Sequence, residues 1–256
     1  YGADIKIISR KEAQRIDSNI NSSIKCAAFC EMDGYVSANQ TGNAYSKALK
    51  ENKVKILENY DVSKIDYHKN KYVIIFKNGE KLTASSIILA TGVNLEKTLK
   101  LLQINIKIKC LPQQLIVSER MPKIMDTVIT VANGKLSLKQ FKNGTVLIGG
   151  GWPGIGNIED NYTETKPENL IGNMMLACHA IPRLKSSRVA RVWLGLEAET
   201  DDAMPIIGEI PNYENAYVIG SIHSGYTSGP YMGKLLAEKI LGKDIDLSLF
   251  DIKRFL

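Results

Sequence analysis

The sequence predicts a mixed α/β fold. The chain has 256 residues, 44% of them hydrophobic and 23% charged, which is enough for one large or two modest domains with a proper core. Short β-prone runs alternate with helical periodicity, and Asn-Gly pairs between strand runs indicate antiparallel hairpins. Over residues 216–241 a strand, a glycine-rich loop and a helix follow one another.

The first part of the chain alternates short strands with two helices. Glu12 stands three residues after Ser9, a capping-box spacing that predicts a helix over Ser9–Ile16. Cys26 and Cys30 share one face of a strand over Ile24–Glu31, and we expect both to be buried. The other expected elements are a helix over Gln40–Glu51, strands over Val54–Glu58, Val62–Tyr67, Tyr72–Phe76, Lys81–Thr83 and Ser86–Leu89, and a hairpin turn at Asn78-Gly79.

A second β-rich stretch fills the middle of the chain, and a helix ends it. Thr227 or Ser228 is the expected cap of the last helix, with Pro230 in its first turn. Such a helix start offers unpaired N–H groups and a positive dipole end, which suit an anion or a polarised ring edge. The expected strands are Ile104–Val117, Thr127–Ala132, Leu136–Phe141, Val146–Gly150, Arg188–Leu196 and Ala216–Ile219, with turns at Asn133-Gly134 and Asn143-Gly144 and a helix over Pro167–Arg183.

Composition narrows the class of protein. The net charge is +6 and the pI is near 9.0, but the lysines are scattered, which favours a solvated surface over a polyanion footprint. None of the four cysteines has CxxC spacing and no histidines cluster near them, so we expect reduced thiols in a cytoplasmic compartment and no metal site. No apolar run approaches the roughly 18 residues of a membrane span.

Two motifs carry a resemblance to a known family. Asp201, then Pro205-Ile206-Ile207-Gly208, a strand and GSIHSGYTSGPYMGKLLAE resemble the closing segment of D-amino-acid-oxidase-type flavoproteins, which include glycine and sarcosine oxidases and flavin subunits of amine dehydrogenases. Ala90-Thr91-Gly92 resembles the turn that these proteins place beside the dinucleotide. The resemblance implies non-covalently bound FAD, with the loop against its isoalloxazine. The implied cofactor-binding residues are Val62, Ala90, Thr91, Gly92, Gly220, Ser221, Ile222, His223, Ser224, Gly225, Tyr226 and Thr227.

The resemblance also implies how the chain is divided. Residues 33–103 and 205–256 are expected in an incomplete FAD-binding domain, interleaved with an antiparallel-sheet substrate domain at residues 1–32 and 104–204. No G-x-G-x-x-G follows a first strand; Gly149–Gly156 is nearest, but Pro153 and the hairpin before it fit no Rossmann turn. Because that fingerprint lies N-terminal to these segments in the family, we expect a fragment that lacks the pyrophosphate-binding half, binds FAD poorly alone and is inactive.

The implied chemistry is oxidation of the C–N bond of a small amine or amino acid by hydride transfer to flavin N5, with a glycine-, sarcosine- or D-amino-acid-like substrate. No acid–base residue is assigned. Many relatives hold the substrate carboxylate with the Arg of a W-x-G-L-R-P run. Here Glu197 stands where the family often has that Arg. If its side chain faces the substrate, it repels a carboxylate and suits an amine or a cationic substrate. The alternative is that the side chain points away from the substrate. His223, Trp193 and Gln114 are the other candidate substrate residues.

Two other functions stay open. The same fold serves in tRNA wobble-uridine modification, and the charge of +6 motivates that alternative, although no basic and aromatic residues interleave. A further alternative is that the chain is the flavin subunit of a multi-chain amine dehydrogenase, which passes electrons to a partner. The substrate and the electron acceptor are not determined by the sequence.

Overall fold

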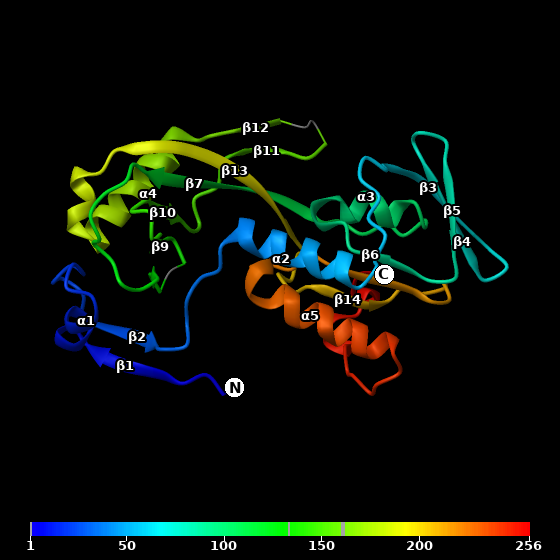
Figure 1. Ribbon diagram of the computed structural model, residues 1–256, viewed down its shortest axis with the longest axis horizontal. Coiled ribbons are helices and arrows are strands. Elements are labelled where there is room, and N and C mark those ends of the chain that lie inside the picture. The colour runs from blue at the N-terminus through cyan, green and yellow to red at the C-terminus, as the bar shows by residue number, and fades with distance from the viewer. Residues whose placement is uncertain (1, 133, 160–161) are drawn as a thin grey trace. The chain divides into compact units, whose positions relative to one another are not determined.

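The computed structural model describes residues 2–132, 134–159 and 162–256 and has the predicted mixed α/β character (Figure 1). Contacts between Cα atoms divide the chain into two compact units. Unit 1 consists of residues 1–37 and 112–195, and unit 2 consists of residues 38–111 and 196–256. Each unit is therefore assembled from two segments that are far apart in the sequence.

Unit 1 opens with a small antiparallel pair. Strand β1 (Ile5–Ser9) pairs with β2 (Cys26–Cys30), and helix α1 (Arg10–Ile16) lies between them in the chain. The capping box is confirmed, because the Ser9 hydroxyl accepts from the Glu12 N–H and the Glu12 carboxylate accepts from the Ser9 N–H. The expected burial of Cys26 is wrong: it faces Ser9 at the end of a two-stranded sheet and is exposed, while Cys30 is half-buried.

A five-stranded antiparallel sheet forms the body of unit 1. Its strand order is β13-β7-β10-β9-β8, and both β7 and β13 continue past the unit boundary into unit 2. Helix α4 packs against β10 and gives the sheet a core of buried Ile, Leu and Val side chains. The elements are β7 (Lys109–Ser118), β8 (Ile129–Thr130), β9 (Ser137–Gln140), β10 (Val146–Gly149), β11 (Ile155–Asn157), β12 (Tyr162–Glu164), α4 (Pro167–Ala180), the 3-10 turn η2 (Pro182–Ser186) and β13 (Val189–Glu199).

The hairpin that Asn143-Gly144 predicts is confirmed. It joins β9 to β10, which pair antiparallel. Gly144 has φ +90°, and a Cβ there would lie 2.7 Å from the carbonyl oxygen of Met121, so the turn needs glycine. Asn133 of the other predicted turn lies outside the described residues.

Unit 2 contains a β-meander of β3 (Val62–His68), β4 (Lys71–Phe76) and β5 (Lys81–Ala84). The Asn78-Gly79 turn joins β4 to β5, as predicted. Helix α2 (Ala38–Glu51) precedes the meander. The predicted strand over Val54–Glu58 is wrong: Leu57 packs on the core while Val54 and Ile56 are exposed, and the segment joins no sheet of the described residues.

A second sheet of unit 2 determines where its functional groups meet. Its order is β14-β15-β6, with β15 (Ala216–Gly220) parallel to β6 (Ile87–Leu89) and antiparallel to β14 (Ile206–Glu209). The carboxyl ends of two parallel strands lie at one edge of the sheet, so the turns after β6 and β15 come together. The remaining elements are η1 (Gly92–Asn94), α3 (Leu95–Lys100), α5 (Gly225–Ile240), η3 (Ser248–Phe250) and η4 (Ile252–Phe255).

Helix α5 starts earlier than predicted. Ser224 is its N-cap residue, with φ +57°, so Thr227 and Ser228 lie inside the first turn and neither is the cap. Pro230 is then within the helix, where its ring nitrogen cannot donate to the carbonyl of Tyr226. In the described part of the chain, every helix is too short or too polar to span a bilayer.

Candidate cofactor pocket

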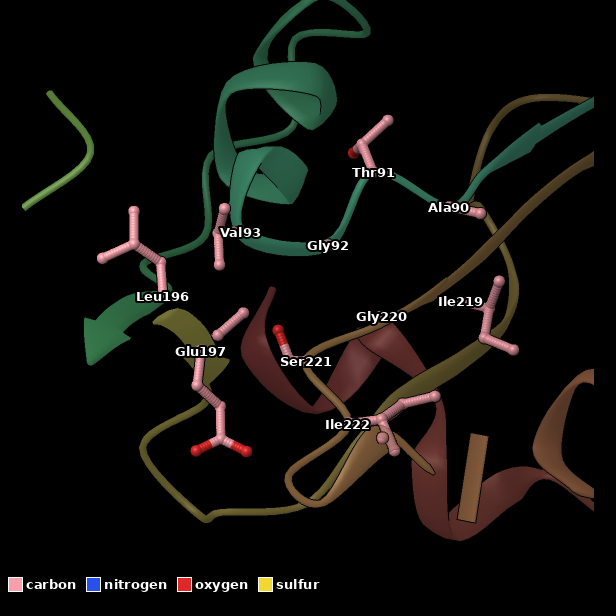
Figure 2. A pocket seen from close by; sticks show the side chains of 12 residues that line it. Ala90, Thr91, Gly92, Val93, Leu196, Glu197, Ile219, Gly220, Ser221 and Ile222 are labelled. Carbon is pink, nitrogen blue, oxygen red and sulfur yellow. The ribbon is translucent and has the colours of Figure 1, made fainter. Parts of the chain in front are cut away.

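A pocket of about 650 Å³ lies at the carboxyl ends of β6 and β15, wholly within unit 2 (Figure 2). The volume falls in the range of small-molecule sites, roughly 300–1,000 Å³. Its walls are mostly apolar and include two glycine-containing turns. The lining residues are Ala90, Thr91, Gly92, Val93, Leu196, Glu197, Ala198, Ile219, Gly220, Ser221, Ile222 and Gly225.

The two turns have this shape for identifiable reasons. Gly92 begins the 3-10 turn η1 with φ +54°, a backbone conformation that favours glycine. Gly220 ends β15 directly against α3, where a Cβ would lie 2.6 Å from Cδ2 of the fully buried Leu95. A side chain at position 220 would therefore require either the buried Leu95 side chain or the β15 turn to shift.

Ser221 is the unusual residue of the pocket. It has φ +50°, which is rare for a residue with a side chain, and it is only 2% exposed. Its hydroxyl is the one buried side-chain polar atom without a hydrogen-bond partner among the residues that the structure describes. In Figure 2 the hydroxyl points toward the side of the pocket formed by Gly92 and Val93.

Charge is concentrated around Glu197, the single charged residue among the described residues that line the pocket. Nδ1 of His223 lies 3.3 Å from Oε1 of Glu197 and 3.7 Å from Oε2 of Glu199. The backbone N–H of Ser224 donates to Glu197 Oε1 at 3.1 Å. The Glu197 carboxylate thus stands at the start of α5, where the helix dipole favours a negative charge. In Figure 2 it points away from Gly92.

The structure brings together most of the predicted cofactor residues. Seven of them line the pocket: Ala90, Thr91, Gly92, Gly220, Ser221, Ile222 and Gly225. His223 and Ser224 contact Glu197 instead, and Tyr226 and Thr227 lie in the first turn of α5. Val62 begins β3 in the meander and is not among the lining residues.

Two predicted substrate residues, Gln114 and Trp193, lie in unit 1. Gln114 is 3% exposed, and its amide is used at both ends: Nε2 donates to the carbonyl of Lys166, and Oε1 accepts from the Lys166 N–H. Trp193 is 39% exposed, with the Arg191 guanidinium 5.7 Å from its ring. The hydrogen bonds of Gln114 therefore join two segments of unit 1, whereas Trp193 is exposed on the surface.

Four lining residues were not predicted: Val93, Leu196, Ala198 and Ile219. Each is next to a predicted residue in the sequence, and this position is the signal by which the sequence could have identified it. They supply the apolar walls that a planar ring system requires. Nowhere in the described ranges do three or more His, Cys, Asp or Glu side chains gather to hold a metal ion.

Comparisons with known proteins agree on one family. The family model described as DAO, FAD dependent oxidoreductase, matches residues 1–239. The hydrogen cyanide synthase subunit HcnC of Pseudomonas protegens is 26% identical over 93% of this chain and 57% of its own. A subunit of the opine oxidase of Rhizobium meliloti is 21% identical over 97% of this chain and 64% of its own. This chain thus spans about three fifths of the length of these two relatives.

A solved structure shows the same fold. The crystal structure of L-proline dehydrogenase from P. horikoshii matches 99% of this chain and 69% of its own, with a TM-score of 0.90 and 23% sequence identity. The likeness extends over both units, each of which is built from two separated segments.

Proposed function

The chain belongs to the FAD-dependent oxidoreductase family, and from that premise we propose that the intact protein oxidises the C–N bond of a small amine or amino acid. FAD, when bound, supplies the acceptor for the hydride that leaves the substrate carbon. The sequence resemblance to glycine and sarcosine oxidases supports this substrate class, as does the similarity to a relative named as part of an opine oxidase.

The observation that carries the proposal is the meeting of two turns in one pocket. The Ala90–Gly92 turn and the Gly220–Ile222 turn are about 130 residues apart in the sequence and line the same space of about 650 Å³. A fit to FAD is supported by the apolar walls, by the buried Ser221 hydroxyl without a partner and by Gly225, which begins α5 at the pocket. We assign unit 2 to the cofactor and unit 1 to the substrate.

We propose that FAD is held without a covalent bond. No cysteine, histidine or tyrosine is among the described residues that line the pocket. The chain's own groups would hold the ring by packing from Val93 and Ile219 and by polar contacts from the loop at residues 220–225. Val62, His223, Ser224, Tyr226 and Thr227 remain proposed cofactor residues on the resemblance alone.

Glu197 favours substrates with a positive charge over those with a carboxylate near the pocket. Its carboxylate lies at the start of α5, where the helix dipole favours an anion, and it accepts a hydrogen bond from the Ser224 N–H. A second carboxylate brought there would be repelled by Glu197 and Glu199. We therefore propose an amine or a cationic substrate. Trp193 and Gln114 remain proposed substrate residues on the resemblance alone.

The test is anaerobic mixing of the intact, purified protein with a panel of amines and amino acids, monitored by visible absorption. The protein should carry the yellow colour of oxidised flavin, and a productive amine should bleach it. Amines without a carboxylate should bleach it faster than their amino-acid counterparts. A yellow protein that no amine or amino acid bleaches would contradict the proposed reaction, and a protein that retains no FAD would contradict the proposed cofactor.

A second proposal concerns partners. Both curated relatives named above are described as subunits, which supports a role for the intact protein as the flavin subunit of a larger enzyme. Purification of the tagged protein from its own cells, followed by mass spectrometry, should recover a stoichiometric second chain. Recovery of the tagged chain alone, with full amine-oxidising activity, would contradict this proposal.

A further inference from the structure

We propose that the Ser221 hydroxyl hydrogen-bonds directly to the ring system bound in the pocket. The inference rests on the proposed function, in which that ring is the isoalloxazine of FAD. It adds one specific side-chain contact to a loop that the sequence resemblance places near the cofactor only as a whole.

The first support is the unsatisfied hydroxyl. A buried polar atom without a partner costs stability, and in native proteins such atoms are few and need an explanation. Ser221 is 2% exposed, and no other buried side-chain polar atom in the described part of the chain lacks a partner. Ser221 lies in the wall of the pocket, and its hydroxyl points toward the side formed by Gly92 and Val93 (Figure 2), so a ligand seated against that side is the partner that we infer.

The second support is the backbone. Ser221 has φ +50°, a conformation that glycine adopts at little cost and serine does not. Glycine at this position would remove both the strain and the unsatisfied hydroxyl. A residue that is unfavourable in two independent ways, at the wall of a pocket, indicates a role in binding and not in folding.

The chemistry of the group fits the ligand. A serine hydroxyl both donates and accepts, and the polar edge of an isoalloxazine carries carbonyl and ring-nitrogen acceptors next to an N–H donor. The other polar side chains of the pocket are less suited, because Thr91 is exposed and Glu197 points away from Gly92. Ser221 is thus the buried, inward-facing hydrogen-bonding side chain of this wall.

Ser221→Ala in the intact protein separates binding from folding. Without ligand, the variant should melt at the same temperature as the wild type or higher, because it no longer buries an unsatisfied hydroxyl. Its Kd for FAD should rise about tenfold, since one hydrogen bond is lost, and the visible spectrum of the bound flavin should shift. Its Kd for ADP, which lacks the ring, should not change. Ser221→Gly should behave in the same way.

Ser118→Ala is the matched control. Ser118 is equally buried and lies in unit 1, but its hydroxyl donates to the Glu119 carbonyl at 2.7 Å and accepts from the Val146 N–H at 2.8 Å. This variant should melt at a lower temperature and bind FAD with the Kd of the wild type. Ser118 thus shows how a buried serine with a purely structural role responds to the same substitution.

Three outcomes would overturn the inference while leaving the proposed function intact. In the first, Ser221→Ala binds FAD with the Kd and the spectrum of the wild type. In the second, its Kd for ADP rises as much as its Kd for FAD. In the third, its melting temperature falls as far as that of Ser118→Ala. A wild-type protein that binds no FAD would instead overturn the proposed function itself.

Discussion

At the scale of single residues, we propose that Glu197 determines which charge the pocket favours. Its carboxylate accepts from the Ser224 N–H and lies 3.3 Å from Nδ1 of His223, so loop and strand are joined through one side chain. Glu199, on the same strand, is 3.7 Å from the same nitrogen. A cation that approaches this cluster finds two carboxylates and a single histidine, and it is attracted.

The first prediction concerns the charge of Glu197. Glu197→Gln keeps an acceptor for the Ser224 N–H and removes the charge. If the substrate is cationic, its KM should rise about fivefold, equivalent to about 1 kcal/mol for a partly exposed charge pair, and kcat should change less. Steady-state kinetics with an amine and with the matching amino acid measure this. Glu238→Gln, which breaks an exposed pair with Lys243, is the control. Equal KM changes for both substrates would contradict a charge-selecting role.

The second prediction concerns the glycine that ends β15. Gly220→Ala places a Cβ 2.6 Å from Leu95 Cδ2, in a core that is already filled. Overpacking of this kind costs about 1 to 3 kcal/mol, which a lower urea midpoint would report. Gly225→Ala is the matched control, because its Cβ meets no atom within 4 Å and alanine favours the helix. A Gly220→Ala protein as stable as Gly225→Ala would show that Leu95 yields without cost.

At the scale of elements, the sequence predicted correctly those helix starts and hairpin turns that depend only on residues next to one another in the chain. The capping box of α1 and the Asn-Gly hairpins need only neighbouring residues, and both are present. The segment Val54–Glu58 has a strand-like composition but pairs with no described strand. Proline at position 230 favours a first turn there, with the cap at Thr227 or Ser228, whereas Ser224 in a left-handed conformation caps the helix three or four residues before those positions.

Asp202 and Arg254 clamp the C-terminal 3-10 turn η4 to the loop before β14. Arg254 Nε donates to Asp202 Oδ2 at 2.7 Å, and Nη2 donates to the carbonyls of Met204 and Pro205 at 2.9 Å. Asp202 also accepts from the Thr200 hydroxyl and the Met204 N–H. The Arg254 hydrogen bond is the largest cause that holds the pKa of Asp202 well below its usual range.

The third prediction follows from that lowered pKa. A carboxyl group with a lowered folded-state pKa stabilises the fold above its unfolded-state pKa, near 4, and loses that contribution as the pH falls through the folded-state value. Asp202→Asn should therefore lower the melting temperature at pH 7 by a few degrees, since screening limits so exposed a pair to about 1 kcal/mol. The difference from the wild type should shrink below about pH 4. Asp61→Asn, which removes a more exposed pair with Lys77, should have less effect. A difference that is the same at pH 7 and pH 3 would exclude a charge effect.

At the scale of the whole molecule, the site depends on pairings that no local signal encodes. The parallel register of β15 with β6 joins Ala216 to Ile87 and Val218 to Leu89, and only this pairing brings the two predicted turns to one pocket. The family resemblance supplied the turns themselves. It did not supply the contact of Glu197 with His223, or the unsatisfied Ser221 hydroxyl, because both arise from side-chain packing between segments that are remote in the sequence.

The fourth prediction uses the division into two units. If FAD binds in the pocket of unit 2, FAD at 100 times its Kd should stabilise the intact protein by about 2.7 kcal/mol. Hydrogen exchange should slow in the turns at residues 90–93 and 219–225, most of which line the pocket. Exchange in strands β9 and β10, which lie in the core of unit 1, should slow by no more than this overall stabilisation, because none of their residues lines the pocket.

ADP distinguishes the ring from the rest of the cofactor in the same experiment. Because ADP has no isoalloxazine, it should leave exchange at residues 219–225 close to that of the free protein, whereas FAD should slow it. Protection of those residues by ADP and FAD to the same extent would show that the pocket receives the nucleotide and not the flavin. Slower exchange confined to β9 and β10 would move the cofactor to unit 1 and contradict the assignment of unit 2.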